Sequence, residues 1–354
     1  MLFFCIFVKI DMLRTVLSSA LHMKGIKSLL LVLLASFAFA SCGNGNTAKA
    51  LLPKVSGKAG EVVVVIEKAD WDGALGNEVR DVLACECDWL VQSEPLYSLV
   101  NVPPGGFIDL FKYHRNIVAF NIDPQIVKPG LVYKTDVWAN PQVVLQISAH
   151  SSDEALEIFK NNEEVIVSAI EQAERDRVIH NTMLYEQRDL FTTVCDVMGG
   201  SPHFPSGYRL KLKKDDFIWI ADEKPNSLIQ AVFVYKYPVP EGDVFTADAI
   251  IAKRNEFLKA NVPGMFENTY MTTSDYFPIT VEYIKFKGRD FAQTRGFWEV
   301  YNDYMGGPFV SHTFYNQDGS EIIVLEAFVY APKYDKRQYL RQVESLLYSF
   351  EWKK

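Results

Sequence analysis

The stretch that decides the fold is VSHTFYNQDGSEIIVLEAFVY, residues Val310 to Tyr330. Apolar and aromatic residues dominate both ends, and the intervening Asn316-Gln317-Asp318-Gly319 is typical of a turn between paired strands. We therefore expect antiparallel strands at Val310–Tyr315 and Ile322–Tyr330. The second of them begins with four consecutive apolar residues, which indicates a central strand with both faces buried.

The rest of the second half extends this antiparallel pattern around two helices. Thr246 is suited to cap a helix that ends at Pro263-Gly264. A terminal helix, about Lys336–Tyr348, repeats its apolar residues at helical spacing. Further strands are expected at Tyr208–Leu212, Phe217–Ile220, Ile229–Tyr235, Ile279–Phe286 and Arg295–Tyr301.

The first half mixes helices and strands more closely. The β-branched run Val62–Ile66 is typical of a strand buried on both faces. Ser151 and Glu154 form a capping box, and we expect a long helix after them, broken near His180–Glu186, and a second helix at Asp189–Met198. Other helices are expected near Ala74–Ala84 and Phe107–Tyr113, with strands at Leu96–Val102, Ile117–Ile122, Val132–Trp138 and residues 143–147.

These patterns predict an α+β fold of two mixed α/β halves, the second a mainly antiparallel sheet with a middle and a C-terminal helix. The run Gly199-Gly200-Ser201-Pro202 marks the expected boundary between an N-terminal domain, residues 60–198, and a C-terminal domain, residues 199–354. The element order of the second half resembles the small fold shared by photosystem PsbP and Mog1 proteins. A resemblance of this kind implies no function.

Residues 1–41 are predicted to be a signal-peptide region. The basic segment Met23–Lys27 precedes an apolar run, Ser28–Ala40, which is shorter than the ~20 residues that a membrane-spanning helix needs. Met23 is therefore the expected true start. The alternative is a transmembrane helix formed by the earlier apolar residues.

The small residues before Cys42 resemble the lipobox of bacterial lipoproteins. That resemblance implies that Cys42 carries acyl chains such as palmitate and that these chains anchor the protein to a membrane. Residues 42–59 would be the lipid anchor and a flexible tether. Surface-exported lipoproteins of this kind often carry an acidic run just after the cysteine, and this chain does not, so the resemblance favours the periplasmic face of the outer membrane. The alternative is an ordinary cleaved signal followed by a chance cysteine.

Composition excludes some partners. The chain has 36 basic and 44 acidic side chains, a net charge of -8, and nucleic-acid binding needs basic patches instead. We expect no nucleic acid partner. Beyond Cys42 the chain holds Cys85, Cys87 and Cys195, too few for a disulfide framework, although Cys195 could bridge to either of the others.

Motifs for common chemistries are absent from the sequence. It has no P-loop, no dinucleotide-binding glycine motif after the first strand, no zinc-ligand spacing and no nucleophile elbow. We therefore expect no cofactor, no metal site and no catalytic residue. A Ser–His–Asp set assembled from distant segments stays open, because the histidines are scattered singly: His114, His150, His180, His203 and His312.

From about Gly60 to Trp352 the chain resembles a family of Bacteroidota lipoproteins whose domain is classed as of unknown function, DUF4837. The resemblance implies a location in the cell envelope and continuity of fold, and it implies no activity. The segments that carry it are Glu94-Pro95, Arg115-Asn116-Ile117, Phe217-Ile218-Trp219, Arg295-Gly296-Phe297-Trp298-Glu299, Met305-Gly306-Gly307-Pro308-Phe309, Tyr330-Ala331-Pro332-Lys333 and Ser349-Phe350.

The segment Arg295–Phe309 is the candidate binding site. Arginine with tryptophan and tyrosine is the residue mix of recognition hot spots, and paired glycines allow close backbone approach. We expect this segment and Arg115 to line a groove for a ligand or partner. The alternative is a hairpin whose glycines form a bulge and whose aromatic residues fill the core. The predicted binding residues are Arg115, Arg295, Trp298, Glu299, Tyr301, Gly306 and Gly307.

The sequence therefore predicts a cell-envelope protein without catalytic activity that binds an unknown envelope protein or a small ligand. The alternative is an envelope hydrolase acting on glycan or peptide. Glu299 and Asp303 are its candidate carboxylates, since glycosidases use two carboxyl groups at a set separation.

Overall fold

The computed structural model describes residues 51–225 and 228–353. The predicted signal region, its start at Met23 and the lipidation of Cys42 lie outside the described residues. Residues Pro53–Lys354 form one compact unit. None of the helices within the described ranges has both the length and the apolar character needed to cross a membrane.

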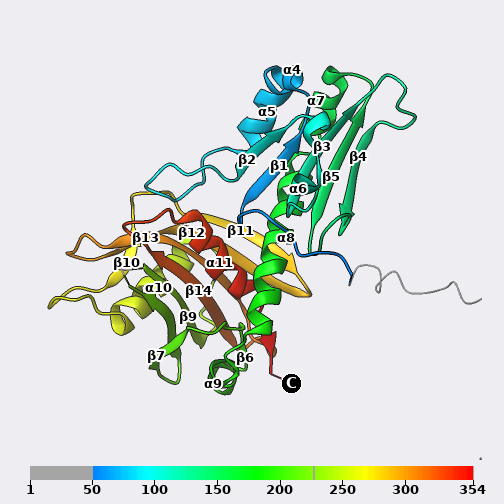
Figure 1. The fold of residues 1–354 in the computed structure, drawn as a ribbon. Helices are drawn as coiled ribbons and strands as arrows, with labels where there is room; N and C mark the ends of the chain where they lie inside the picture. Colours follow the sequence, from blue (N-terminus) through cyan, green and yellow to red (C-terminus); the bar gives the residue numbers. More distant parts are fainter. Residues whose placement is uncertain (1–50, 226–227, 354) are drawn as a thin grey trace, which may run out of the picture. The chain divides into compact units, whose positions relative to one another are not determined.

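The first sheet is mixed, with strand order β2-β1-β3-β5-β4 (Figure 1). Strands β1, β2, β3 and β5 run parallel, and β4 pairs antiparallel with β5. Both faces of β1 are buried, as its β-branched run predicts. The strands are β1 Glu61–Val65, β2 Ser98–Val102, β3 Asn116–Ile122, β4 Gly130–Thr135 and β5 Val143–Ala149.

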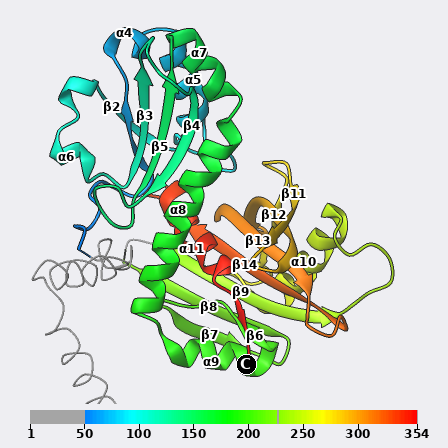
Figure 2. The ribbon, with the colours of Figure 1, turned by 90° about the vertical axis from the view of Figure 1, so that its right-hand side faces the viewer.

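Helices cover this sheet. Apolar residues of α5, α7 and the first half of α8 pack on one face, and Phe107, Phe111 and Trp138 pack on the other. Figure 2 shows α8 as the longest helix, running from the first sheet toward the second. The helices are α4 Lys68–Trp71, α5 Ala74–Leu83, α6 Asp109–Lys112, α7 Ser152–Lys160, α8 Glu163–Leu184 and α9 Arg188–Met198, with a short 3₁₀ turn at Pro104–Gly106.

The second sheet is antiparallel, with strand order β10-β12-β13-β14-β9-β8-β7, and β11 pairs with β12. Residues 310–330 lie at its centre, in a hairpin of β13 and β14. The strands are β7 Arg209–Lys213, β8 Phe217–Lys224, β9 Leu228–Pro238, β10 Met271–Ser274, β11 Thr280–Phe286, β12 Arg289–Val300, β13 Gly306–Tyr315 and β14 Glu321–Tyr330.

Helices also cover both faces of the second sheet. One face packs against α11, Arg337–Tyr348, together with α9 and the end of α8. The opposite face packs against α10, Ala247–Asn261. Two short strands, β6 Gly200–Ser201 and β15 Glu351–Trp352, pair with each other in a separate two-stranded sheet. The predicted α+β class is therefore confirmed.

The structure refines the helix predictions. Thr246 caps α10, since its Oγ1 accepts from the Ala249 backbone N–H at 3.3 Å. Ser151 caps α7 through the Glu154 N–H at 3.2 Å, but the Glu154 carboxylate accepts from His150 N–H at 2.6 Å and not from the cap residue. The expected long helix is two helices, because α7 ends at Lys160 and α8 begins at Glu163. The expected break after His180 is confirmed between α8 and α9.

Candidate functional site

Trp298, predicted to line a groove, lies in the core of the second sheet. Only 2% of its surface is exposed. Its indole N–H donates to the Val329 carbonyl at 3.3 Å, and its ring meets Phe328 edge-on at 5.3 Å between centroids. A side chain in this position stabilises the sheet and presents no surface to a ligand.

Of the two glycines, Gly307 lies against Trp298 in this core, whereas a Cβ atom at Gly306 would meet the Phe297 ring. Gly307 pairs with Trp298 in the ladder between β12 and β13. A Cβ atom at Gly307 would collide with the Val329 carbonyl oxygen, so the close approach of the strands requires glycine here. The register of the two strands is continuous from Ala292 to Glu299, and the bulge that we expected in the hairpin alternative is not found there.

The charged residues of the predicted segment lie in different surroundings. Arg295 makes two hydrogen bonds to Glu344 of α11, at 2.5 and 3.2 Å. Because successive residues of a strand point to opposite faces, Arg295 and Trp298 lie on opposite faces of the sheet. Tyr301 is half-exposed and stacks on Tyr270 with ring centroids 5.0 Å apart.

The carboxylates of the hydrolase alternative lie on different kinds of element. Glu299 is in β12, opposite Gly306 and Thr272. Asp303 lies in the turn beyond β12, where its carboxylate accepts from the Tyr304 backbone N–H at 2.6 Å. The pair therefore does not share one helix face.

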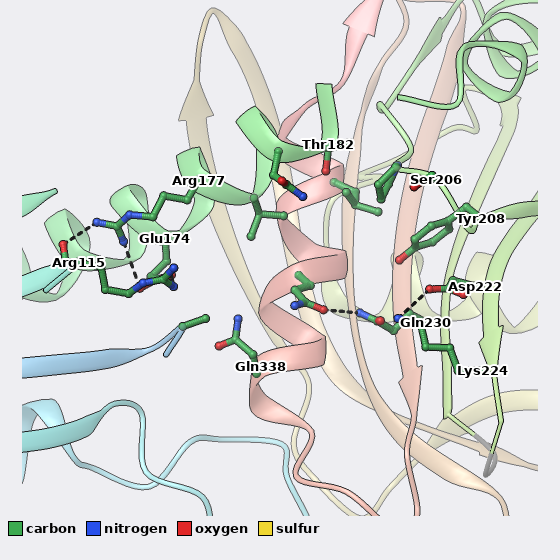
Figure 3. A pocket seen from close by; sticks show the side chains of 16 residues that line it. Arg115, Glu174, Arg177, Thr182, Ser206, Tyr208, Asp222, Lys224, Gln230 and Gln338 are labelled. Carbon is green, nitrogen blue, oxygen red and sulfur yellow. Dashed lines mark hydrogen bonds and ion pairs between the residues drawn. The ribbon is translucent and has the colours of Figure 1, made fainter. Parts of the chain in front are cut away.

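Arg115 is separate from the other predicted residues and borders a polar pocket of about 340 Å³ (Figure 3). Its walls come from the residues before β3, from α8 and α11, from β8 and β9, and from the loop before β7. On α8 and α11 the lining residues recur three or four positions apart, as one helix face requires. The lining residues are Ala59, Arg115, Glu174, Arg177, Val178, Asn181, Thr182, Pro205, Ser206, Tyr208, Asp222, Lys224, Gln230, Gln338, Gln342 and Leu346.

Glu174 holds one end of the pocket together. Its side chain is 1% exposed. Its carboxylate accepts from Arg115 Nη1 at 3.0 Å and Asn116 Nδ2 at 2.7 Å. It also accepts from the Gly60 backbone N–H at 3.2 Å and lies 3.1 Å from Arg177 Nη1. Three hydrogen bonds and the Arg177 ion pair hold this carboxylate in place, so it positions the two guanidinium groups.

The two arginines differ in how many of their donors are engaged. Arg177 donates from Nε to the Pro141 carbonyl, from Nη1 to Asn116 Oδ1 and from Nη2 to the Arg115 carbonyl, at 3.0, 2.9 and 2.8 Å. Burial lowers the pKa of Arg177 to about 10, against the opposing attraction of Glu174. The Arg115 side chain donates to Glu174 alone among the described residues, and its buried Nε has no partner there.

Amide side chains line the middle of the pocket. Gln230 Nε2 donates to the Tyr339 carbonyl at 3.1 Å and to Gln342 Oε1 at 3.2 Å. Gln338 Oε1 accepts from Arg341 Nη1 at 3.4 Å. In both Gln338 and Gln342 the oxygen is thus engaged by the protein, and within the described ranges neither amide nitrogen donates to a protein acceptor.

The opposite end of the pocket carries a charge pair. Lys224 Nζ lies 3.2 Å from Asp222 Oδ2. Figure 3 shows this pair across the pocket from Arg115 and Glu174, with Gln230 and Gln338 between the two ends. Burial, with a smaller contribution from Asp222, raises the pKa of Tyr208, so its hydroxyl stays protonated at neutral pH.

Sequence reasoning identified one residue of this pocket, Arg115. The others escaped it because they belong to segments far apart in the chain and to no short motif. The polar spacing of Gln338 and Gln342 on α11 was the available signal, and it is equally typical of a solvated helix face. In the part of the chain that the structure describes, no group of three or more His, Cys, Asp or Glu side chains is placed to hold a metal ion.

Comparisons with known proteins identify two matching families. The model described as "Domain of unknown function (DUF4837)" matches residues 164–349, and that described as "Domain of unknown function (DUF8532)" matches residues 55–183. The first match begins within α8 and includes α11 and the second sheet, and the second match includes the first sheet. Both matches include part of the pocket wall.

The comparisons with curated proteins and with solved structures give no further information about function. No protein of curated function matches the chain. A crystal structure from Bacteroides thetaiotaomicron VPI-5482 is similar at 11% sequence identity with a TM-score of 0.25. The similarity covers 44% of this chain and 46% of that chain, less than half of either. It supports no statement about function.

Proposed function

This chain belongs to the family of the domain of unknown function DUF4837, and from that premise we propose that it is a noncatalytic protein that binds a small polar ligand. The polar pocket bordered by α8 and α11 is the proposed binding site. Its volume of about 340 Å³ is in the range of small-molecule sites.

One observation supports this proposal most strongly: hydrogen-bond donors in the pocket wall lack protein acceptors. Among the described residues, the protein supplies one acceptor, Glu174, to the Arg115 side chain. The amide nitrogens of Gln338 and Gln342 also donate to no protein acceptor there, while their oxygens are held in place. A wall of positioned donors suits recognition of a ligand rich in oxygen atoms.

The same geometry favours binding over catalysis. The buried carboxylate, Glu174, accepts three hydrogen bonds and lies beside Arg177, so it serves as the charge partner of two arginines. Asp222 is paired with Lys224 at the other end of the pocket. Both carboxylates of the pocket wall, Glu174 and Asp222, are thus paired with cations of the protein.

We further propose that lipid on Cys42 anchors the protein to the periplasmic face of the outer membrane. The basic, apolar and small-residue segments before Cys42 support this location. Cells expressing the wild type or Cys42→Ala are grown with labelled palmitate and fractionated. The wild type should be labelled and membrane-bound. Equal labelling of Cys42→Ala would contradict the assignment.

Native mass spectrometry tests the binding proposal. The purified protein is mixed with the small-molecule fraction of a cell-envelope extract, and the same is done with Asn181→Trp and His180→Trp. Asn181 lines the pocket and is exposed, so tryptophan there should fill the cavity without unfolding α8. His180 is exposed on the same helix outside the lining and is the matched control.

The proposal predicts a mass adduct on the wild type and on His180→Trp, and none on Asn181→Trp. Circular dichroism checks that both variants are folded. An adduct that survives in Asn181→Trp would place binding elsewhere. The lack of any adduct would oppose a small ligand and favour a protein partner.

A further inference from the structure

The ligand class of this pocket follows from its charges. Two guanidinium groups, Arg115 and Arg177, share one buried carboxylate, Glu174. Asp136 adds a weaker attraction that acts on Arg177. The positive charge of Arg115 is therefore less completely neutralised by the protein than that of Arg177. A cation that is incompletely neutralised in a partly buried wall favours a bound anion.

The hydrogen bonds show which arginine is open to such an anion. Nε, Nη1 and Nη2 of Arg177 all donate to protein oxygen atoms. Arg115 uses Nη1 for Glu174, and its Nη2 donates to no acceptor in the described ranges. The Arg115 side chain is 17% exposed, which leaves it accessible from the pocket. An anion would therefore bind to Arg115.

The number of open charged donors limits the charge of the anion. A phosphate monoester carries almost two negative charges and is best bound by several cations. Here one guanidinium is open, and Lys224 at the far end is already paired with Asp222. A single negative charge, as on a carboxylate, matches this end of the pocket better.

The remaining wall requires uncharged oxygen acceptors. Figure 3 shows Gln338 between the two ends, and its oxygen accepts from Arg341. Gln342 lines the same pocket, and its oxygen accepts from Gln230. Hydroxyl or carbonyl oxygens of a ligand can accept from the amide nitrogens of these two residues. The wall also contains four apolar residues: Ala59, Val178, Pro205 and Leu346.

We propose that the pocket binds a small monocarboxylate that carries further hydroxyl or carbonyl oxygens, with its carboxylate on Arg115 and those oxygens on Gln338 and Gln342. This assignment rests on the proposed function, since it names the ligand class of the same site. Two sources supply this chemistry, a sugar acid and the carboxyl end of a short peptide.

Calorimetric titration of the full chain with matched pairs of compounds tests the assignment. One arm compares D-glucuronate with D-glucose, and the other compares N-acetyl-alanyl-alanine with its C-terminal amide. Methyl phosphate is a third probe. The acid of one pair should bind, roughly 10- to 100-fold more tightly than its neutral counterpart, because the charged hydrogen bonds are lost in the latter.

Substitutions of the pocket residues test which side chains bind the acid. Arg115→Gln should reduce affinity for the acid to that for the neutral compound, and Gln338→Ala with Gln342→Ala should weaken both members of the pair. Arg188→Gln is the control, since it removes the same charge from an exposed arginine that does not line the pocket. Thermal unfolding shows which variants remain folded. If Arg115→Gln does not fold, the Gln338→Ala and Gln342→Ala variants still test the assignment.

The outcomes separate this inference from the proposed function. Equal affinity for acid and neutral compound, tighter binding of methyl phosphate, or no binding of either acid would overturn the monocarboxylate assignment. In each case, a mass adduct from the envelope extract that forms on the wild type and is lost in Asn181→Trp would still support the proposed binding function. If that adduct is also missing, the proposed function fails together with the ligand class.

Discussion

Arg341 of α11 donates to the Glu171 carboxylate of α8, from Nη2 to Oε1 at 2.6 Å and from Nε to Oε2 at 3.2 Å. The Tyr97 hydroxyl donates to the same carboxylate at 2.7 Å. Helices α8 and α11 supply much of the pocket wall, so this ion pair helps to set the distance between Glu174 on one and Gln338 on the other. The pocket thus depends on contacts outside its lining.

Arg341→Met should destabilise the protein by about 3 kcal/mol, because it leaves the largely buried Glu171 carboxylate without its cation. Urea unfolding followed by circular dichroism measures the change. Arg188→Met, at an exposed arginine, is the control and should change the free energy of unfolding little. Equal effects of the two substitutions would show that the ion pair does not stabilise the fold.

The same pair predicts a pH dependence. Burial raises the pKa of Glu171, but Arg341 outweighs this effect and holds the pKa below its ordinary value of 4.5. A carboxyl with a lowered folded-state pKa stabilises the fold above the unfolded value, and that contribution is lost as the pH falls through the folded value. The stability difference between wild type and Arg341→Met should therefore shrink below pH 4.5 in urea titrations. A difference that stays constant to pH 3 would contradict it.

A second ion pair is fully buried between α10 and the second sheet. Arg254 of α10 donates to both oxygens of Glu326 of β14, at 3.0 and 2.8 Å, and both side chains are 0% exposed. Arg254→Met should cost about 3–5 kcal/mol, because it leaves an uncompensated charge in the core. The double variant Arg254→Met with Glu326→Leu should recover much of this loss.

Lowering the pH should partly rescue the single variant Arg254→Met. Burial raises the pKa of Glu326 and the arginine opposes this rise, so the pKa should be higher still without Arg254. The folded variant then binds a proton more readily than the unfolded chain, and its stability rises as the pH is lowered toward 4.5. Urea titrations at pH 7 and 5 measure this, and unchanged stability would argue against a buried charge.

Trp298→Ala distinguishes a core residue from a binding residue. Removing a buried tryptophan should lower the free energy of unfolding by about 3–5 kcal/mol. Tyr304→Ala is the comparison from the same segment, since Tyr304 is fully exposed, and should change stability by less than about 0.5 kcal/mol. A stable Trp298→Ala protein would revive the groove predicted from the sequence.

Cys87 should react slowly with alkylating reagents. Burial raises its pKa from 9.0 to about 11, with a smaller contribution from Glu94, and the nearby arginines do not offset this. The thiolate fraction at pH 8 should then be about 100-fold below that of an ordinary thiol. Iodoacetamide labelling in native buffer and in urea, followed by peptide mass spectrometry, measures it. Equal rates in both conditions would show that Cys87 is not shielded.

Local signals in the sequence predicted much of the fold. The cap at Thr246 depends on residues three positions apart, and the β13–β14 hairpin depends on one turn. The break between α7 and α8 escaped prediction because Asn161 and Asn162 interrupt the helix without Gly or Pro. Strand β10 is short and depends on pairing with β12, which sequence spacing does not show.

The candidate site was much less predictable than the fold. Glu174 accepts from Gly60 and from Asn116, which lie 114 and 58 positions away in the chain. Contacts over such separations leave no local pattern. The aromatic composition around Trp298 is shared by recognition surfaces and by cores, and burial decides between them. Arg115 was found because its segment also carries the resemblance to the family.

Hydrogen–deuterium exchange resolved by peptide, with and without the small-molecule fraction of an envelope extract, tests most directly that ligands bind in the pocket. The account predicts slower exchange in peptides that cover residues 205–208 and α11, whose residues line the pocket, and unchanged exchange around Tyr301–Tyr304. Protection confined to Tyr301–Tyr304 would contradict the account and return the site to the segment that the sequence predicted.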